Sequence, residues 1–222
     1  MGWTILARMV GGRQLVLMAL PAVAALLYVM VRRPVPRGPA LGLRGLWLVG
    51  VALGLHIVRF EVLSPTLASG TGVGRAHGLL TLACAGGFLA LNWATVTGGS
   101  PWARTGLVAS VAGVAANALP VALVGAMPVL RPAALSAGFT PAELATAPPG
   151  YVVAADAGDP VVWLGDVLPV PGGLTVLSLG DLLLFAGFTI LIGLALASRA
   201  GARSATDVAP VGASITREGE ST

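Results

Sequence analysis

Long apolar stretches, separated by short linkers that hold most of the charged residues, constrain this fold more than any other feature of the sequence. Hydrophobic residues make up 56% of the 222 residues and charged residues only 10%, whereas a soluble domain carries about 25% charged residues. So few charges could not cover a water-facing surface of this size. The sequence therefore predicts an integral membrane protein whose apolar stretches are helices, because lipid offers the backbone no hydrogen-bond partners.

Five stretches approach the length of about 20 residues that a spanning helix needs. We expect these helices near residues 14–31, 44–60, 77–97, 105–126 and 179–198. The first contains Pro21, which implies a kink, and its apolar run continues past a weak cleavage-site pattern, which favours a retained helix over a signal peptide. The tight turn Gly98–Pro101 makes the third and fourth helices antiparallel neighbours.

Other segments do not form a continuous span. Residues 127–160 are a long Pro- and Ala-rich loop. Residues 161–177 are apolar but broken by glycines and prolines, which predicts an interfacial hairpin or a short re-entrant element. Residues 199–222 are predicted to be a disordered cytoplasmic tail. The expected fold class is an all-α membrane protein, with a single polytopic domain over residues 1–198 and a broken element before the last helix.

Small residues recur on one face of the fourth expected helix. Gly106, Ser110 and Gly113 follow one another at spacings of one helical turn. Such residues let two helix backbones approach closely. They indicate tight packing inside the molecule, and a dimer face is the alternative.

The arginines predict an orientation. With five spans, eight of the 13 arginines lie on one side, and the other side also collects acidic residues of the long loop. The positive-inside rule then places the C-terminus in the cytoplasm and the N-terminus outside, in a multi-pass protein of the cell inner membrane. Although the net charge is +4, the arginines lie in linkers rather than in a polar patch, so no nucleic-acid partner is expected.

Two carboxylates near the last helix are candidates for a polar site, because ionisable groups in a membrane are costly. Asp181 lies three residues after Ser178, which is the spacing of a capping box, and it is expected to cap the last helix. Asp166 has no such local explanation. It could bind backbone N–H groups, pair with an arginine, or take part in substrate or proton binding.

Three polar residues share the outer ends of the second and third helices. His56 and Arg59 end the second helix and His77 begins the third, so antiparallel packing brings the two histidines to similar depth. Two facing histidines could hold a haem iron. Hydrogen bonding at the interface, with an arginine paired to Glu61, is the better interpretation, and neither a metal nor a cofactor is expected.

Three residues inside the helices have structural interpretations. Asn117, ahead of Pro120, and Asn92 are expected to bond backbone carbonyls or to join helices. Cys84, the single cysteine, is expected to be a packed apolar side chain.

Two segments of the C-terminal half are distinctive, residues 163–171 (WLGDVLPVP) and 177–183 (LSLGDLL). They resemble a small family of bacterial polytopic membrane proteins, the uncharacterised family DUF5317. Met127-Pro128-Val129 fits the same pattern, although the family often has Asn-Gly-Gly before Met-Pro, where this chain has Val124-Gly125-Ala126. The resemblance implies a membrane fold, draws attention to Asp166 and Asp181, and says nothing about an activity.

Motifs for catalysis are missing from the sequence. There is no phosphate-binding glycine loop after a strand, no metalloprotease helix and no Ser-x-x-Lys pair, so an enzyme is not favoured. We expect a non-enzymatic accessory or scaffold protein of the bacterial cell envelope, in contact with the lipid bilayer and with a membrane protein partner or a second copy. The alternative is a small-molecule or ion carrier that uses Asp166 in a broken membrane segment.

Overall fold

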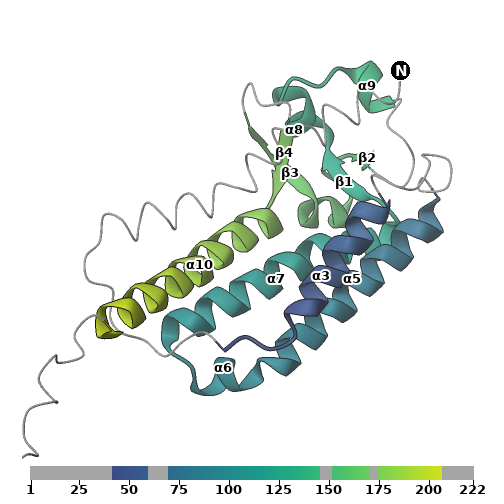
Figure 1. Ribbon diagram of the computed structural model, residues 1–222. Coiled ribbons are helices and arrows are strands. Elements are labelled where there is room, and N and C mark those ends of the chain that lie inside the picture. The colour runs from purple at the N-terminus through teal and green to yellow at the C-terminus, as the bar shows by residue number, and fades with distance from the viewer. Residues whose placement is uncertain (1–41, 60–69, 146–151, 171–174, 207–222) are drawn as a thin grey trace, which may run out of the picture.

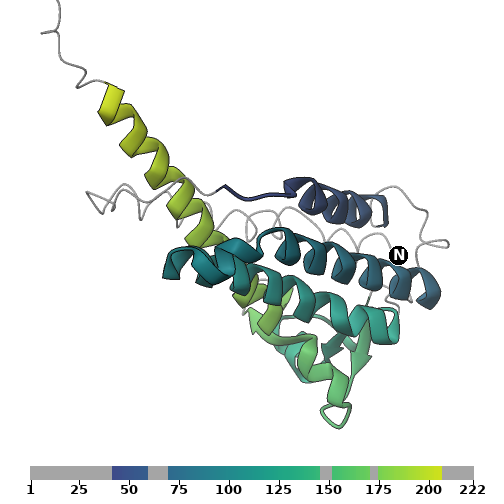
Figure 2. The same cartoon turned by 90° about the horizontal axis from the view of Figure 1, so that it is seen from below.

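Four helices of the described part of the chain pack in a row. The computed structural model describes residues 42–59, 70–145, 152–170 and 175–206. Helix α5 packs between α3 and α7, and α7 packs between α5 and α10 (Figures 1 and 2). A short helix, α6, lies where the chain turns from α5 to α7. The bounds are α3 Leu46–Ile57, α5 Thr71–Leu91, α6 Trp93–Gly98, α7 Pro101–Val124 and α10 Leu179–Thr206.

Within the described residues, three helices are long and apolar enough to cross a membrane. They cover Thr71–Leu91, Pro101–Val124 and Leu179–Leu196. Helix α3 has 12 residues, or about 18 Å at 1.5 Å per residue, which is less than the roughly 30 Å of a hydrocarbon core. The expectation of five spans is therefore not confirmed. The expected helix 14–31 lies outside the described residues.

A capping residue accounts for the observed start of α7. Ser100 Oγ accepts a hydrogen bond from the Ala103 N–H at 3.2 Å, and Pro101 occupies the first turn, so α7 begins earlier than residue 105. Helix α5 packs against α7, as expected for antiparallel neighbours, but begins at Thr71 and ends before Asn92.

Helix α10 is longer than expected. It continues to Thr206 and so extends into residues 199–206 of the predicted tail. Alanine and arginine, which are strong helix formers, dominate this stretch and extend the preceding helix. The remainder of the predicted tail, residues 207–222, lies outside the described residues.

A four-stranded sheet covers the end of the helical row where α7 ends and α10 begins (Figure 1). The strand order is β2-β1-β3-β4, in which β1 runs parallel to β2 and β3, and β3 and β4 form an antiparallel pair. Two short helices and a 3₁₀ helix connect the strands. We call this unit the cap; its elements are β1 Met127–Leu130, α8 Arg131–Ser136, α9 Pro141–Ala145, β2 Val152–Ala155, η2 Pro160–Leu164, β3 Asp166–Val170 and β4 Thr175–Ser178.

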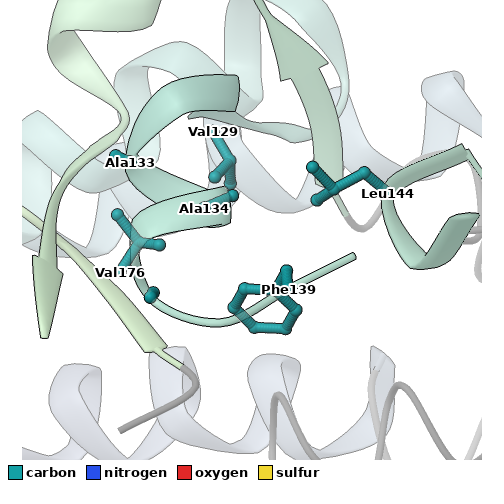
Figure 3. Packing of buried hydrophobic residues seen from close by; sticks show 7 residues of the cluster. Val129, Ala133, Ala134, Phe139, Leu144 and Val176 are labelled. Atoms are coloured by element: carbon teal, nitrogen blue, oxygen red, sulfur yellow. The ribbon is translucent and has the colours of Figure 1, made fainter. Parts of the chain in front are cut away.

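The cap has a hydrophobic core of its own. Gly138 has φ 100° and ends α8 in a Schellman arrangement, with the Phe139 N–H bonded to the Ala134 carbonyl at 3.1 Å. This turn folds Phe139 back under the helix (Figure 3). The buried cluster consists of Val129, Ala133, Ala134, Ala137, Phe139, Leu144 and Val176.

The sheet corrects the all-α expectation, because residues 127–160 were expected to be a loop. Its strands have only four or five residues, too few for an alternating pattern to stand out. Two of them also contain a proline, Pro128 in β1 and Pro169 in β3, which argues against a strand. Strands β3 and β4 do form a hairpin, one of the two alternatives for residues 161–177. The re-entrant alternative is not confirmed.

Candidate functional site

A network of polar side chains lies at the junction between the cap and the helices, where β4 runs directly into α10. The Asp181 N–H donates to Ser178 Oγ at 2.9 Å, and the Ser178 N–H donates to Asp181 Oδ2 at 3.0 Å. This reciprocal pair is a capping box. It confirms the predicted role of Asp181 as a helix cap.

Asn117 of α7 completes a three-residue network with the capping box. Its Nδ2 donates to Asp181 Oδ1 at 2.6 Å, and Ser178 Oγ donates to Asn117 Oδ1, also at 2.6 Å. Ser178 is fully buried. The expected joining of two helices by Asn117 is confirmed, since this amide links α7 to the first turn of α10.

Close helix contact brings Asn117 to the junction. A Cβ on Gly113 of α7 would lie 2.6 Å from the Gly180 carbonyl oxygen of α10, and a Cβ on Gly180 would collide with the Asn117 amide oxygen. A Cβ on Gly187 would similarly collide with Ser110. The small-residue face of α7 therefore packs against α10 inside the molecule. This confirms the prediction of tight internal packing for Gly106, Ser110 and Gly113.

Asp166 enters the junction from the sheet. It lies opposite Ser178 in the β3–β4 pair, with an irregularity between Asp166 and Leu168. Directly opposed residues project from the same face of a sheet, so Asp166 and Ser178 share the face that meets the helices. Asp166 is half-buried. Burial, followed by the nearby Asp181 carboxylate, raises the pKa of Asp166 well above its ordinary value.

The two carboxyl groups at the junction thus have different roles. Asp181 accepts hydrogen bonds from a backbone N–H and from Asn117. Asp166 lies where its charged form is disfavoured, which suits it to hold a proton. The junction can therefore fix the cap in place and bind a proton.

A second polar cluster lies between α3 and α5. Arg59 Nη1 and His77 Nδ1 are 3.1 Å apart, and the rings of His56 and His77 are 5.9 Å between centroids. The prediction that the two histidines lie at similar depth is confirmed. His56 lies on α3, Arg59 two residues after its end, and His77 on α5. The structure therefore does not bring His56, Arg59 and His77 together with Asp166, Asp181 and Asn117, the other candidates for a polar site.

Metal binding finds little support in this cluster. The buried Arg59 guanidinium places a positive charge beside one of the two histidines. Among the residues that the structure describes, no group of three or more His, Cys, Asp or Glu side chains is arranged to hold a metal ion.

Asn92 joins α5 to the chain that precedes α3. Its Oδ1 accepts from the Arg44 N–H and its Nδ2 donates to the Arg44 carbonyl, both at 2.8 Å. The amide also bonds the Phe88 carbonyl at 2.8 Å. The residue is buried and has the structural role expected of it.

The contact of Ser178 with α7 was missed from the sequence. A signal for it was present, because α7 and α10 each carry two glycines seven residues apart: Gly106 and Gly113, Gly180 and Gly187. Small residues repeated on one face of a helix are typical of a close contact between helices.

Comparison with known proteins gives one match. The model of a family of unknown function, DUF5317, matches residues 40–193. No curated protein and no solved structure matches the chain. The matched range contains the cap, the junction residues and all of the described helices except the end of α10.

Proposed function

The chain belongs to DUF5317, a family of unknown function, and we propose from its geometry that it is a non-enzymatic accessory protein. In this role it holds the cap at one face of a membrane, where the cap binds a membrane protein partner. The observation that carries the proposal is the Ser178–Asn117–Asp181 network. Its polar groups bond one another, so they serve to fix the cap on the helices. A rigidly mounted cap suits the display of a binding surface.

Tryptophans support the position in the bilayer. Trp47, Trp93 and Trp102 are exposed at the starts of α3, α6 and α7, where indole rings would lie at headgroup level. Helix α7, with 24 residues, is about 36 Å long, which matches a hydrocarbon core of about 30 Å with its interfaces.

Charge supports the orientation. Arg44 is bonded to Asn92 beside α6 and Arg104 lies in the first turn of α7, whereas the cap carries one arginine, Arg131, together with Glu143, Asp156 and Asp159. By the positive-inside rule the α6 end faces the cytoplasm and the cap faces outward, in a bacterial inner membrane.

The surface proposed for the partner lies on η2 and the β3–β4 hairpin. Trp163, Leu164 and Leu168 are exposed there, at 53%, 38% and 36%. Buried aromatic anchors dominate many protein interfaces, so Trp163 is the residue expected to contribute most to binding.

The test is photo-crosslinking in the native membrane. A photoreactive amino acid at position 163 is compared with the same amino acid at position 102, an exposed tryptophan at the other end. We expect one stoichiometric protein adduct at position 163 that position 102 does not give. If position 163 crosslinks only lipid, the partner proposal is wrong.

Asp166 favours a second candidate, an ion carrier that takes up a proton at the junction. The supporting observation is its half-buried position beside Asp181, which raises its pKa. In vesicles that contain the purified protein, proton uptake driven by a potassium gradient should be lost in Asp166→Asn. It should be retained in Asp156→Asn, whose side chain is 83% exposed. If the unmodified protein carries no proton flux, the carrier is ruled out.

A further inference from the structure

The four-helix row has an apolar groove that runs between α3 and α10, over α5 and α7. Its lining comes from all four helices and includes Leu48, Ala52, Cys84, Phe88, Val114 and Phe188. The groove also reaches Ser110, whose hydroxyl already donates to the Gly106 carbonyl at 2.8 Å. The lining therefore offers a ligand almost nothing but hydrocarbon.

The size of the groove argues against a small-molecule site. The hollow holds about 70 Å³, whereas sites for drug-sized ligands measure about 300–1,000 Å³. A volume of this order suits a few apolar side chains inserted from a neighbouring helix.

The walls of the groove are incompletely covered. Helix α3 packs on α5, and α10 packs on α7, so the groove lies open between the two outer helices. Val49 on one wall is 40% exposed and Phe188 on the other is 36% exposed. One further helix laid along the groove would contact both walls and bury both side chains.

We propose that the apolar N-terminal segment, residues 14–31, occupies this groove as a fifth helix of the bundle. As a helix its 18 residues would extend about 27 Å, comparable with the helices that line the groove. The segment contains Ala22, Ala24 and Ala25, small residues that let helix backbones approach closely.

The chain connection makes this placement reachable. Asn92 holds the backbone of Arg44 at the α6 end of the row, so the N-terminal segment must leave the described structure from that end. Residues 32–43 form the connection, and a chain of that length reaches about 40 Å when extended. The segment can therefore turn back and lie antiparallel to α3 over the groove. Residues 14–31 precede the family match at residue 40, so this contact is proposed for this chain.

Cys84 provides the probe, because it is the single cysteine of the chain and lines the groove. A second cysteine is introduced at one position at a time over residues 19–29, and the full chain is oxidised in native membranes with copper phenanthroline. We expect disulfides within one chain, identified by mass spectrometry of the linked peptides, at positions that recur every three or four residues. In the matched control, Cys84→Ala with Val108→Cys, the probe lies on the exposed face of α7 and should give at least several-fold less crosslinking.

The other occupants give different results. Disulfide-linked dimers with Cys84 would show that a second copy fills the groove. Crosslinking at none of the positions, with Cys84 freely labelled by an apolar maleimide, would show that lipid fills it. Both results overturn the proposal.

A second variant, Ala52→Trp, fills the groove from the α3 wall and should lower the crosslinking yield several-fold, whereas Ala112→Trp on the exposed face of α7 should not. An equal yield in both variants contradicts docking in the groove.

Discussion

Asn117 Nδ2 donates a hydrogen bond of 2.6 Å to Asp181 Oδ1, and this contact ties helix α7 to the first turn of the helix that leaves the sheet. The acceptor is a carboxylate, so the bond belongs to the stronger, charge-assisted class. Ser178, which bonds both residues, is fully buried. Loss of one member therefore leaves polar atoms of the others without partners at the junction.

Asn117→Ala should destabilise the protein by about 1–3 kcal/mol, because it leaves both the Asp181 carboxylate and the Ser178 hydroxyl short of a partner. The loss should combine with that of Ser178→Ala in a clearly non-additive way, since the two residues share one network. Denaturant unfolding in detergent, with the two single variants and the double variant, measures this non-additive loss of stability.

Ser136→Ala, which removes an exposed hydroxyl bonded to Pro132, is the control and should change stability by about 0.5 kcal/mol or less. Strict additivity at the junction would contradict a shared network.

Gly180→Ala tests the close contact of α7 with α10. The added methyl group would collide with the Asn117 amide oxygen and lie 2.8 Å from the Gly113 carbonyl, so the helices must separate. We expect a loss of about 1–3 kcal/mol, typical of overpacking, together with weaker protection of Asn117 in hydrogen exchange. Gly193→Ala on the same helix meets nothing within 4 Å and should be neutral or stabilising by up to about 1 kcal/mol. Equal melting temperatures for the two variants would show that α10 is not packed this tightly.

Parts of this arrangement were predictable because they depend on local patterns. The spacing of Ser178 and Asp181 predicted the capping box, and the Gly106–Ser110–Gly113 face predicted tight packing. The cap was not predictable in the same way, since its sheet joins β1 to strands far along the chain and β1 itself contains Pro128. Nor does a local pattern bring Asp166 to Ser178, because their contact depends on the hairpin register.

Asn92→Leu should loosen the start of α3. The substitution removes both hydrogen bonds to the Arg44 backbone and leaves those backbone groups to find solvent, at a cost of about 1–3 kcal/mol. Hydrogen exchange at the Arg44 amide should become faster, while the amides of α10 should be unaffected. Asn92→Asp keeps the acceptor for the Arg44 N–H but loses the donor to its carbonyl, so it should give an intermediate rate. Unchanged exchange in the leucine variant would mean that Asn92 does not hold this segment.

Asp166 should make stability depend on pH in the direction opposite to an ordinary paired carboxylate. Its pKa in the folded protein lies well above the ordinary value of 3.8, so between the two values the folded state binds more protons than the unfolded state. The free energy of unfolding therefore falls as the pH rises through this window. Above the raised pKa the folded protein bears the whole free-energy cost of holding Asp166 in its charged form. Asp166→Asn removes the cost, so the variant should melt at a higher temperature than the unmodified protein at neutral pH. That difference should shrink as the pH falls toward the ordinary value.

Asp156→Asn, at an exposed site, should show no such convergence. The measurement is thermal unfolding of the unmodified protein and of the two variants across this pH range. If Asp166→Asn melts at the same temperature as the unmodified protein at neutral pH, or at a lower one, the junction does not disfavour the charged carboxylate.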